Sequence, residues 1–359
     1  MMKIEFPVFK TRVQGVDRKF DLTTVAGRRE YFQAKAGLEI AKIKDYLDKG
    51  GTFVAYLLGK KNSGKGTYSK LFAEAIQTDR VAHISIGDLV RSVNEEAKDP
   101  AKKRELIAWL EKNYRGYSDP EEGINILLSR DVSKLLPTEL ILALTKREIA
   151  KHPRKAIFLD GFPRQLDQIS YSLYFRDLID YRQDPDFFVL IDVSASIIDE
   201  RIKYRRICPA CKTPRNLKLL RTSKVQFNKN NKEYELICDN PDCSGGNPVM
   251  VQKEGDSLGI EAIRDRIEAD DTLVEKAFGL YGIPKVLLRN SVPLDVVRDM
   301  VDDYELTPEY VYETQGDGSV KVTEKPWTII DDRGVVSNSL MPAPVALSLI
   351  KQMSDVLGL

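Results

Sequence analysis

The feature that most constrains this sequence is a glycine- and lysine-rich loop, Gly59–Thr67, with the letters GKKNSGKGT. Residues 52–58 before the loop form an apolar run of strand length, and residues 68–77 after it are predicted to form a helix. Glycines allow such a loop to curl until several N–H groups point at phosphate oxygens, and the start of the next helix adds positive potential. Lys65 supplies a mobile charge and Thr67 a hydroxyl that suits Mg²⁺. The pattern predicts a phosphate-binding loop, against the alternative of a lysine-rich surface turn.

Four further apolar runs of strand length alternate with helical stretches along the chain, at residues 81–84, 155–160, 187–192 and 285–289. Continuous apolar strands that alternate with helices are typical of a parallel sheet covered on both faces. We therefore predict an α/β fold of the P-loop NTPase type, with a five-stranded parallel sheet in three layers. The residues expected to contact a nucleoside triphosphate are Gly59, Asn62, Ser63, Gly64, Lys65, Gly66 and Thr67.

Segments at the two ends lie outside this alternation. Residues 32–47 place apolar side chains on one helix face, which predicts an N-terminal helical extension over 1–50. Alternating residues around Gly316–Gly318 predict a β-hairpin, and an amphipathic helix follows it. We therefore expect a core over 51–303 and a C-terminal extension, hairpin plus helix, over 304–359.

Composition excludes several classes of protein. The 55 Lys and Arg residues balance 54 Asp and Glu residues, for a net charge of +1, which argues against wrapping nucleic acid through a net field. An apolar content of 42% excludes wholesale disorder, and no apolar run approaches the ~20 residues of a membrane helix. The first residues lack the apolar stretch of a signal peptide. We expect a cytoplasmic protein without a membrane partner.

The four cysteines fall in one short region as two close pairs. Two such pairs, with prolines and glycines beside them, present the four soft donors of a tetrahedral Zn²⁺ site. Four unliganded thiols and a redox C-x-x-C pair are the alternatives, and no thioredoxin-like unit supports the second. The predicted ligands of a structural zinc ion are Cys208, Cys211, Cys238 and Cys243.

Two further motifs follow predicted strands. Residues 83–91 read HISIGDLVR and residues 159–168 read LDGFPRQLDQ. With the phosphate loop they resemble the nucleoside monophosphate kinases, and adenylate kinases most closely, whose motifs read roughly GxPGxGKGT, HISTGDxLR and DGFPRxxxQ. The resemblance covers about residues 51–300. It implies an acceptor-binding subdomain over 88–150 and a zinc-bearing lid over 204–257.

The resemblance also assigns residues to a nucleoside monophosphate acceptor. Arg91 and Arg164 are planar, permanently charged groups that suit an α-phosphate, and Asp160 can organise Mg²⁺ through water. Ile86 stands where adenylate kinases usually have Thr, and kinases for pyrimidine monophosphates also lack that Thr, so the preferred base stays open. The implied acceptor contacts are Ile86, Asp88, Arg91, Leu135, Leu136, Gly161, Arg164 and Gln168.

Arginines on either side of the cysteines resemble the family's ATP-binding residues. Residues 200–206 (ERIKYRR) resemble ERIxxRR, which implies that Arg201 stacks on the ATP adenine and that Arg205 grips phosphate. Residues 263–267 (IRDRI) resemble VRxRL, which implies a phosphate-clamping role for Arg266. The implied catalytic residues are Lys65, Asp160, Arg164, Arg201, Arg205 and Arg266.

The expected reaction is reversible transfer of the γ-phosphoryl group of ATP to a nucleoside monophosphate, AMP being favoured, with Mg²⁺ and a structural Zn²⁺. Positioning and charge neutralisation supply catalysis, and a closing lid excludes water as a competing acceptor. The alternatives are a kinase for CMP, UMP, GMP or dTMP, and a catalytically weak nucleotide-binding regulator on the same scaffold. A zinc-ribbon nucleic-acid binder is a third, motivated by basic residues at 203–206 and 218–232 but opposed by sparse aromatic residues. We expect a monomer.

Overall fold

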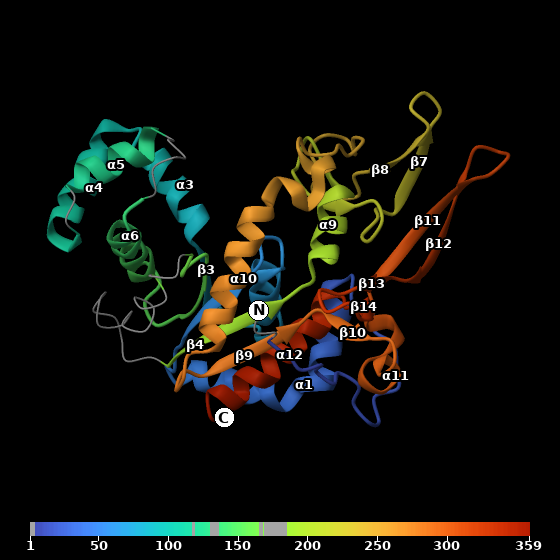
Figure 1. Cartoon of the computed structure of the whole chain (residues 1–359), viewed down its shortest axis with the longest axis horizontal. Helices are drawn as coiled ribbons and strands as arrows, with labels where there is room; N and C mark the ends of the chain where they lie inside the picture. Colours follow the sequence, from blue (N-terminus) through green and yellow to red (C-terminus); the bar gives the residue numbers. More distant parts are fainter. Residues whose placement is uncertain (1–3, 117–118, 130–135, 165–167, 169–184) are drawn as a thin grey trace.

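The computed structural model describes residues 4–116, 119–129, 136–164, 168 and 185–359, and a five-stranded sheet lies at its centre (Figure 1). The strand order is β2-β3-β1-β4-β9, and all neighbours pair in parallel. The predicted α/β fold with a five-stranded parallel sheet is confirmed. The strands are β1 (Val54–Gly59), β2 (Val81–Ser85), β3 (Ala156–Asp160), β4 (Asp186–Asp192) and β9 (Lys285–Arg289).

Strand β1 shows why the central strands are apolar at every position. Successive side chains of a strand point to opposite faces. Ala55 and Leu57 pack into one cluster of buried residues, whereas Val54, Tyr56 and Leu58 pack into another. Both faces of the sheet are therefore covered, and all 6 residues of β1 are buried.

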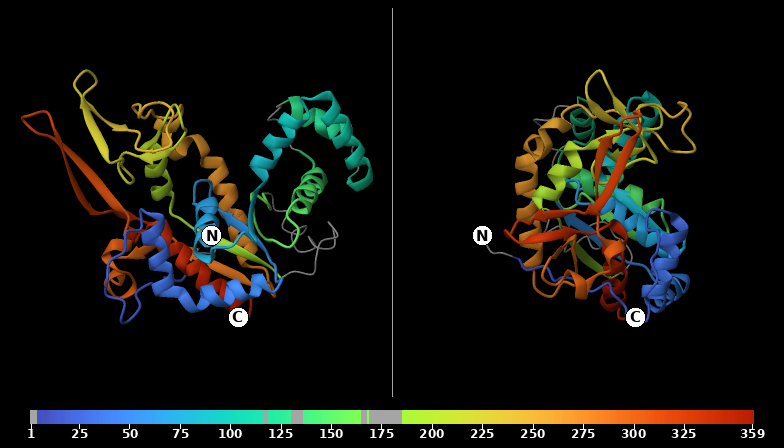
Figure 2. Two further views of the ribbon diagram at one scale, coloured as in Figure 1. Left: turned by 180° about the vertical axis from the view of Figure 1, so that it is seen from behind. Right: turned by 90° about the vertical axis from the view of Figure 1, so that its right-hand side faces the viewer.

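Helices form the two outer layers. On one face, α1, α2 and α12 bury side chains such as Ile43, Phe72 and Ile350, and Figure 2 shows α1 and α12 below the sheet. On the other face, α3, α6 and α10 bury Leu89 and Leu144 among others. Within the described part of the chain, none of the helices has both the length and the apolar character that a membrane span requires. These helices are α1 (Val25–Asp48), α2 (Lys65–Ile76), α3 (Ile86–Glu96), α6 (Thr138–Ala150), α10 (Arg264–Phe278) and α12 (Pro342–Val356).

Helices α3 to α6 form a lobe beside the sheet, in the range predicted for the acceptor subdomain (Figure 1). Asp99 caps the start of α4 by accepting hydrogen bonds from two backbone N–H groups of its first turn. Leu106 and Leu110 of α4 pack with Ile124 of α5 in the core cluster of this face. The lobe therefore has its own apolar contacts while α3 and α6 join it to the sheet. The two outer helices are α4 (Pro100–Asn113) and α5 (Pro120–Ser129).

The cysteine-rich segment, which we call the lid, folds as two small antiparallel sheets, β5–β6 and β7–β8. Its apolar cluster has few members besides cysteine, chiefly Leu236 and Met250. Helix α9 leads into the lid and the 3₁₀ helix η1 leads back to α10. The elements are α9 (Ala195–Lys203), β5 (Arg205–Ile207), β6 (Pro214–Asn216), β7 (Lys224–Asn228), β8 (Glu233–Ile237) and η1 (Asp256–Ile263).

A long insertion separates β9 from α12. The chain leaves the core at Asn290 and returns at Leu340, whose N–H donates to the Asn290 carbonyl at 2.9 Å. Strands β10 and β14 pair antiparallel just beyond these two residues. The predicted hairpin forms between them as β11–β12. The elements of the insertion are β10 (Ser291–Pro293), α11 (Val297–Met300), the 3₁₀ helix η2 (Asp303–Glu305), β11 (Pro308–Thr314), β12 (Val320–Pro326), β13 (Thr328–Ile330) and β14 (Val336–Ser339).

The β11–β12 hairpin docks on the lid (Figure 2). The N–H of Tyr310 donates to the carbonyl of Lys218 at 2.8 Å, and the Tyr312 hydroxyl donates to the carbonyl of Leu217 at 2.5 Å. Lys218 also pairs with Glu309 at 3.2 Å. The insertion thus contacts the lid as well as the sheet.

A buried ion-pair network ties α1 to the insertion. Lys35, whose side chain is fully buried, donates to Glu305 at 2.8 Å and to Asp302 at 2.6 Å. The fully buried carboxylate of Glu305 also accepts from the hydroxyls of Tyr31 at 2.5 Å and Thr11 at 2.6 Å. The N-terminal segment and the insertion therefore fold against each other.

Candidate functional site

The phosphate loop begins where β1 ends and α2 starts. Gly64 has φ of 100°, a conformation rare for residues with a side chain, and a Cβ there would lie 3.0 Å from the Tyr68 ring. Asn62 also has positive φ, 67°, at the position where the motif has glycine, and Asn tolerates this region better than most residues. An α-helix leaves its first N–H groups without partners in the helix, so the start of α2 can bind an anion. The loop has the backbone shape of a phosphate cradle.

Lys65 opens α2 and bends back over the loop. Its Nζ donates to the carbonyls of Gly59 at 2.7 Å and Lys60 at 3.0 Å, and lies 4.0 Å from Oδ1 of Asp160. Burial lowers the pKa of Lys65, although the carboxylates of Asp160 and Asp270 favour its charged form. The charged form of Lys65 is therefore poorly solvated, and a bound polyphosphate would stabilise it.

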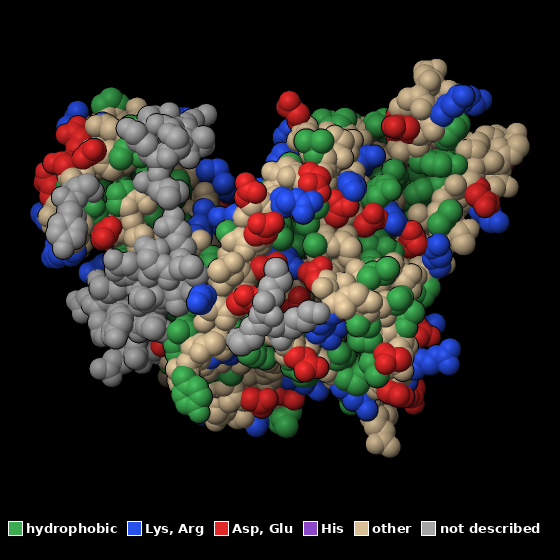
Figure 3. All heavy atoms as spheres, in the orientation of Figure 1, with side chains coloured by type: hydrophobic (Ala, Val, Ile, Leu, Met, Phe, Trp, Pro, Cys, Tyr) green, Lys and Arg blue, Asp and Glu red, His purple; other side chains and the backbone are tan. Residues whose placement is uncertain are grey.

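The loop opens on a cavity of about 580 Å³. Burial lowers the pKa of Arg164 on its wall, and the nearby charge of Arg266 acts in the same direction. Figure 3 shows the surface hollowed between the α3–α6 lobe and α10, with Lys and Arg side chains along the hollow. Such a concentration of positive charge attracts polyanions. Of the predicted site residues, the cavity brings together Asn62, Ser63, Gly64, Lys65, Gly66, Thr67, Asp160, Gly161, Arg164 and Arg266.

Two arginines approach the start of α3. A Cβ on Gly87 would lie 3.3 Å from Nη2 of Arg164 and 3.6 Å from Nη1 of Arg91, so both guanidinium groups face this glycine. Arg91 also hydrogen-bonds Asp88, and both of these side chains are largely exposed. Two planar cations thus converge from different elements, an arrangement suited to a phosphate group.

The other predicted acceptor residues lie in different surroundings. Gln168 is buried, accepts from the N–H of Arg164 at 2.7 Å, and donates to a hydroxyl at the start of α6 at 3.1 Å. Ile86 is 2% exposed and packs in the core cluster rather than on the cavity wall. Leu136 is half-buried, and Leu135 lies outside the described residues. Gln168 therefore fixes the backbone at Arg164, and the acceptor roles of these residues stay predictions.

Arg201 of α9 is held beside the phosphate loop. It donates to the carbonyl of Asn62 at 3.5 Å and to Oδ1 of Asn290 at 3.2 Å, and it interacts with the hydroxyl of Tyr68. Asn290 is fully buried and accepts from the Ser339 hydroxyl at 3.0 Å. The arginine predicted to stack on adenine is therefore fixed by the insertion as well as by the loop.

Arg205 lies in the lid and not on the cavity wall. Its Nε and Nη2 donate to the two carboxylate oxygens of Asp256 at 2.7 and 2.6 Å, and these hydrogen bonds raise the pKa of Arg205. The paired geometry is the strong, directional form of an arginine–carboxylate contact. Arg205 thus joins β5 to η1, and its role toward phosphate stays a prediction.

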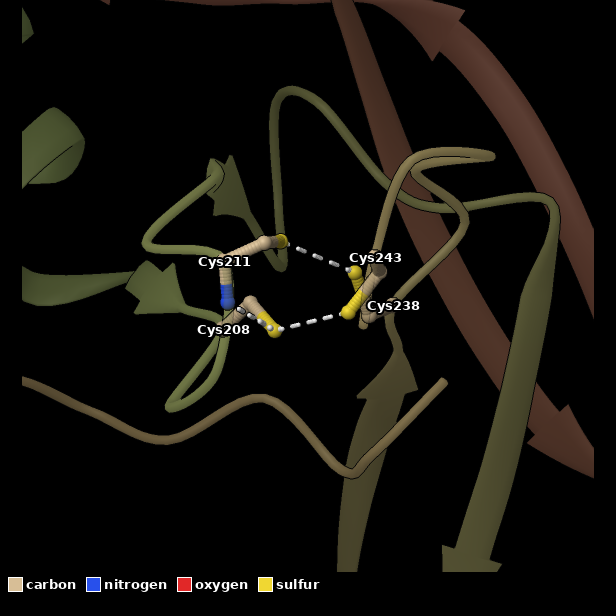
Figure 4. A group of neighbouring side chains, drawn as sticks. All are labelled: Cys208, Cys211, Cys238 and Cys243. Carbon is tan, nitrogen blue, oxygen red and sulfur yellow. Dashed lines mark hydrogen bonds between the residues drawn. The ribbon is translucent and has the colours of Figure 1, made fainter. Parts of the chain in front are cut away.

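The four cysteines converge in the lid (Figure 4). All four sulfur atoms lie within 4.8 Å of one another, and the pairs Cys208–Cys243 and Cys211–Cys238 are 3.7 Å apart. This is too long for a disulfide, at about 2 Å. It matches the edge of roughly 3.8 Å in a tetrahedron whose Zn–S bonds are about 2.3 Å. The residues present fit a tetrahedral metal site.

Two carboxylates outside the predicted set, Asp270 and Asp332, also shape the site. Asp270 accepts from the N–H of Lys61 at 2.9 Å and pairs with Arg266 at 2.9 Å. Asp332, from the insertion, pairs with Nζ of Lys60 at 2.5 Å. The spacing of Asp270 four residues after Arg266 was a usable signal, because such residues are neighbours on a helix. No local pattern links Asp332 to the loop.

Comparisons with known proteins identify relatives of this chain. A family model described as an AAA domain matches residues 58–207. The adenylate kinase of Clostridium acetobutylicum is 30% identical over 232 residues, which cover 64% of this chain and 87% of that protein. The adenylate kinase of Thermotoga neapolitana is 29% identical over 239 residues, or 66% and 89% of the two chains. That of Clostridium novyi is 28% identical over 227 residues, or 63% and 84%.

The match covers most of the length of these relatives, and the phosphate loop occupies the expected place between the central strand and its helix. The parallel sheet and the cluster of four cysteines agree with what the motifs predicted. The chain therefore belongs to the adenylate kinase family of P-loop enzymes.

Proposed function

We propose that the protein transfers the γ-phosphoryl group of ATP reversibly to a nucleoside monophosphate, with AMP as the favoured acceptor. The observation that carries this proposal is the convergence of cations from four elements. Lys65 of α2, Arg164 after β3 and Arg266 of α10 line one cavity, and Arg91 of α3 meets Arg164 at Gly87. A simple ATPase needs cations around one triphosphate only. The additional pair formed by Arg91 and Arg164 suits a second substrate that carries phosphate.

Each cation has a role in this proposal. Lys65 and the loop N–H groups hold the outer phosphates of ATP, while Arg91 and Arg164 hold the α-phosphate of the acceptor. Arg201 and Arg205 bind the ATP side together with Arg266. Phosphoryl transfer spreads negative charge over the transferring oxygens, and fixed cations stabilise that charge without reorganising. No covalent intermediate with the protein is required. The residues proposed for catalysis are Lys65, Asp160, Arg164, Arg201, Arg205 and Arg266.

Oxygen donors for Mg²⁺ face the same cavity. The hydroxyl of Thr67 and the carboxylate of Asp160 both line it, and Mg²⁺ prefers oxygen ligands, so these residues fit the ion that accompanies ATP in this family. When bound, the ion neutralises part of the triphosphate charge.

We propose a structural Zn²⁺ at the four cysteines. The lid has a small apolar cluster, with Leu236 and Met250 as its main members besides cysteine, so packing alone contributes little to its stability. Tetrahedral zinc contributes folding free energy in such modules. The four cysteines fall in one short region instead of being spread along the chain as in a disulfide scaffold, which supports a reducing compartment, the cytoplasm by default.

Two observations bear on which base the acceptor carries. The adenylate kinase relatives support AMP. The apolar, buried side chain of Ile86 offers no hydroxyl at the start of α3, which favours a kinase for another nucleoside monophosphate as the second candidate. A catalytically weak nucleotide-binding regulator is the alternative from a different class.

The test is diphosphate formation from ATP and Mg²⁺ with AMP, CMP, UMP, GMP and dTMP in turn. We expect AMP to react fastest, and Lys65→Met to lower turnover by about a hundredfold or more, because it removes a cation from the transition state. Full activity of Lys65→Met would contradict the assignment of the site. ATP binding without any diphosphate product would identify the regulator instead.

We further propose a functional division of the chain. Residues 51–303 carry the chemistry, with the acceptor bound by 88–150 and ATP covered by 204–257. The flanks, 1–50 and 304–359, brace this core. Helix α12 of the second flank packs against β9 and α2, so the brace includes part of the cover of the sheet.

A further inference from the structure

Asp270 is a buried carboxylate in a cavity meant for a polyanion, and none of the steps proposed above uses it. It lies on α10, is 5% exposed, and lines the cavity together with Lys65 and Arg164. A negative charge there repels the phosphates of ATP, and the repulsion is strong where water is scarce. A carboxylate in this place therefore needs a physical reason.

Both oxygens of Asp270 are engaged by groups that surround the phosphates. Oδ2 accepts from the backbone N–H of Lys61, in the first half of the phosphate loop, at 2.9 Å. Oδ1 pairs with Nε of Arg266 at 2.9 Å. One side chain thus joins the loop backbone to the arginine expected to clamp phosphate.

This contact determines how Arg266 faces the cavity. An arginine held through Nε presents its two terminal nitrogens outward, which is the fork that phosphate oxygens accept. Arg266 is 41% exposed, so it has room to swing away if Asp270 releases it. The charges of Lys65, Arg164 and Arg266 also repel one another, and the carboxylate of Asp270 offsets that repulsion before a nucleotide binds.

We propose that Asp270 is a positioning residue for phosphoryl transfer: it holds Arg266 toward the transferring phosphate and anchors the front of the phosphate loop. The inference rests on the proposed kinase function, from which it takes the role of Arg266. A merely structural ion pair would change stability alone. A positioning residue changes turnover in protein that remains folded.

The variants Asp270→Asn and Asp270→Ala separate the two contacts. In Asp270→Asn the amide oxygen still accepts from the Lys61 N–H, but the charge that holds Arg266 is gone. We expect kcat to fall about tenfold or more with little change in KM for ATP, because the clamp acts mainly in the transition state. Asp270→Ala loses both contacts, so it also raises KM for ATP. Glu268→Gln is the matched control, because it makes the same charge change at an exposed position of α10 and keeps wild-type kcat.

A double-mutant cycle tests whether Asp270 acts through Arg266. In an Arg266→Met background, Asp270→Asn should lower kcat no further, since the group that it positions is already absent. An equal fold-loss in both backgrounds would overturn the proposal. So would a kcat of Asp270→Asn within about twofold of wild type. Activities are compared per folded molecule, measured by urea unfolding of each variant.

The wild-type assay keeps this inference distinct from the proposed function. If the wild-type protein forms no diphosphate from any monophosphate, the kinase proposal fails, and Asp270 is tested through ATP binding instead. The ATP dissociation constant of Asp270→Ala should then be about tenfold higher than that of Glu268→Gln, because the loop loses its anchor and binds ATP more weakly. Equal dissociation constants of the two variants would overturn the inference.

Discussion

At the scale of single residues, Lys65 shows how a phosphate site is prepared before the phosphate arrives. The lysine is 15% exposed, rests on carbonyls of its own loop, and has its pKa lowered by burial. A bound triphosphate surrounds the same amine with negative charge, which raises its pKa again. Binding and protonation are therefore linked.

The linkage predicts proton uptake when ATP binds in alkaline buffer. The lowered pKa means that part of the free protein has already lost the Lys65 proton at alkaline pH, whereas the complex holds it. Calorimetric titration in buffers of different ionisation enthalpy counts the protons.

Lys49→Gln provides the control for this measurement, because Lys49 is exposed at the end of α1 and should not affect the uptake. ATP binding with no proton uptake anywhere in the alkaline range would contradict the coupling.

Sequence motifs were sufficient to predict some residues of the site but not others. Lys65, Arg164 and Arg266 were predicted because each belongs to a pattern at the end of a strand or the start of a helix. Asn290 and Asp332 carry no such mark. Their contacts form only when the insertion folds back on α9 and the loop. Local sequence patterns do not reveal such long-range contacts.

At the scale of elements, the lid is the part least held by packing. Two apolar side chains of the lid, Leu220 and Val251, are 47% and 49% exposed. The buried cluster of the lid is built around the cysteines. The cysteine spacing was sufficient to predict this cluster. The docking of β11–β12 on the lid was not predictable, because alternation specifies a hairpin but not the surface that it meets.

Removal of zinc should therefore unfold the lid and spare the sheet. We expect one zinc per chain, and after chelation we expect fast hydrogen exchange within residues 205–252 while β1 and β4 stay protected. The KM for ATP should rise, since Arg205 loses its fixed place. Exchange of the lid amides is followed by mass spectrometry before and after chelation.

Added Zn²⁺ should restore protection of the lid. Protein purified without chelator that holds no zinc, or exchange that chelation leaves unchanged, would refute the metal site.

At the scale of the whole molecule, the flanks act as one unit. Lys35 of α1 and Glu305 of the insertion are both fully buried and satisfy each other, with Tyr31 and Thr11 completing the hydrogen bonds. Helical periodicity predicted α1, but it did not predict the pairing of Lys35 with Glu305, which lies far along the sequence. Removing one member of such a pair leaves an uncompensated charge in the interior.

Lys35→Met should therefore lower the free energy of unfolding by about 3–5 kcal/mol, as measured by urea titration. Lys49→Met, just after the end of the same helix, breaks only an exposed pair with Asp45 and should cost less than about 1 kcal/mol. Equal losses in the two variants would show that the buried network does not hold the flanks together.

The position of α12 also sets the order in which the molecule can be completed during synthesis. Gln352 bonds both the N–H and the carbonyl of Leu287, so this helix satisfies the outer edge of β9 as well as covering the sheet. That edge is an open template for wrong pairing until α12 arrives. A ribosome makes the lid and the whole insertion between β4 and α12 before it reaches residue 352. The nascent chain therefore carries an unfinished nucleotide-binding core for much of its translation, and this is the interval in which a chaperone would protect it.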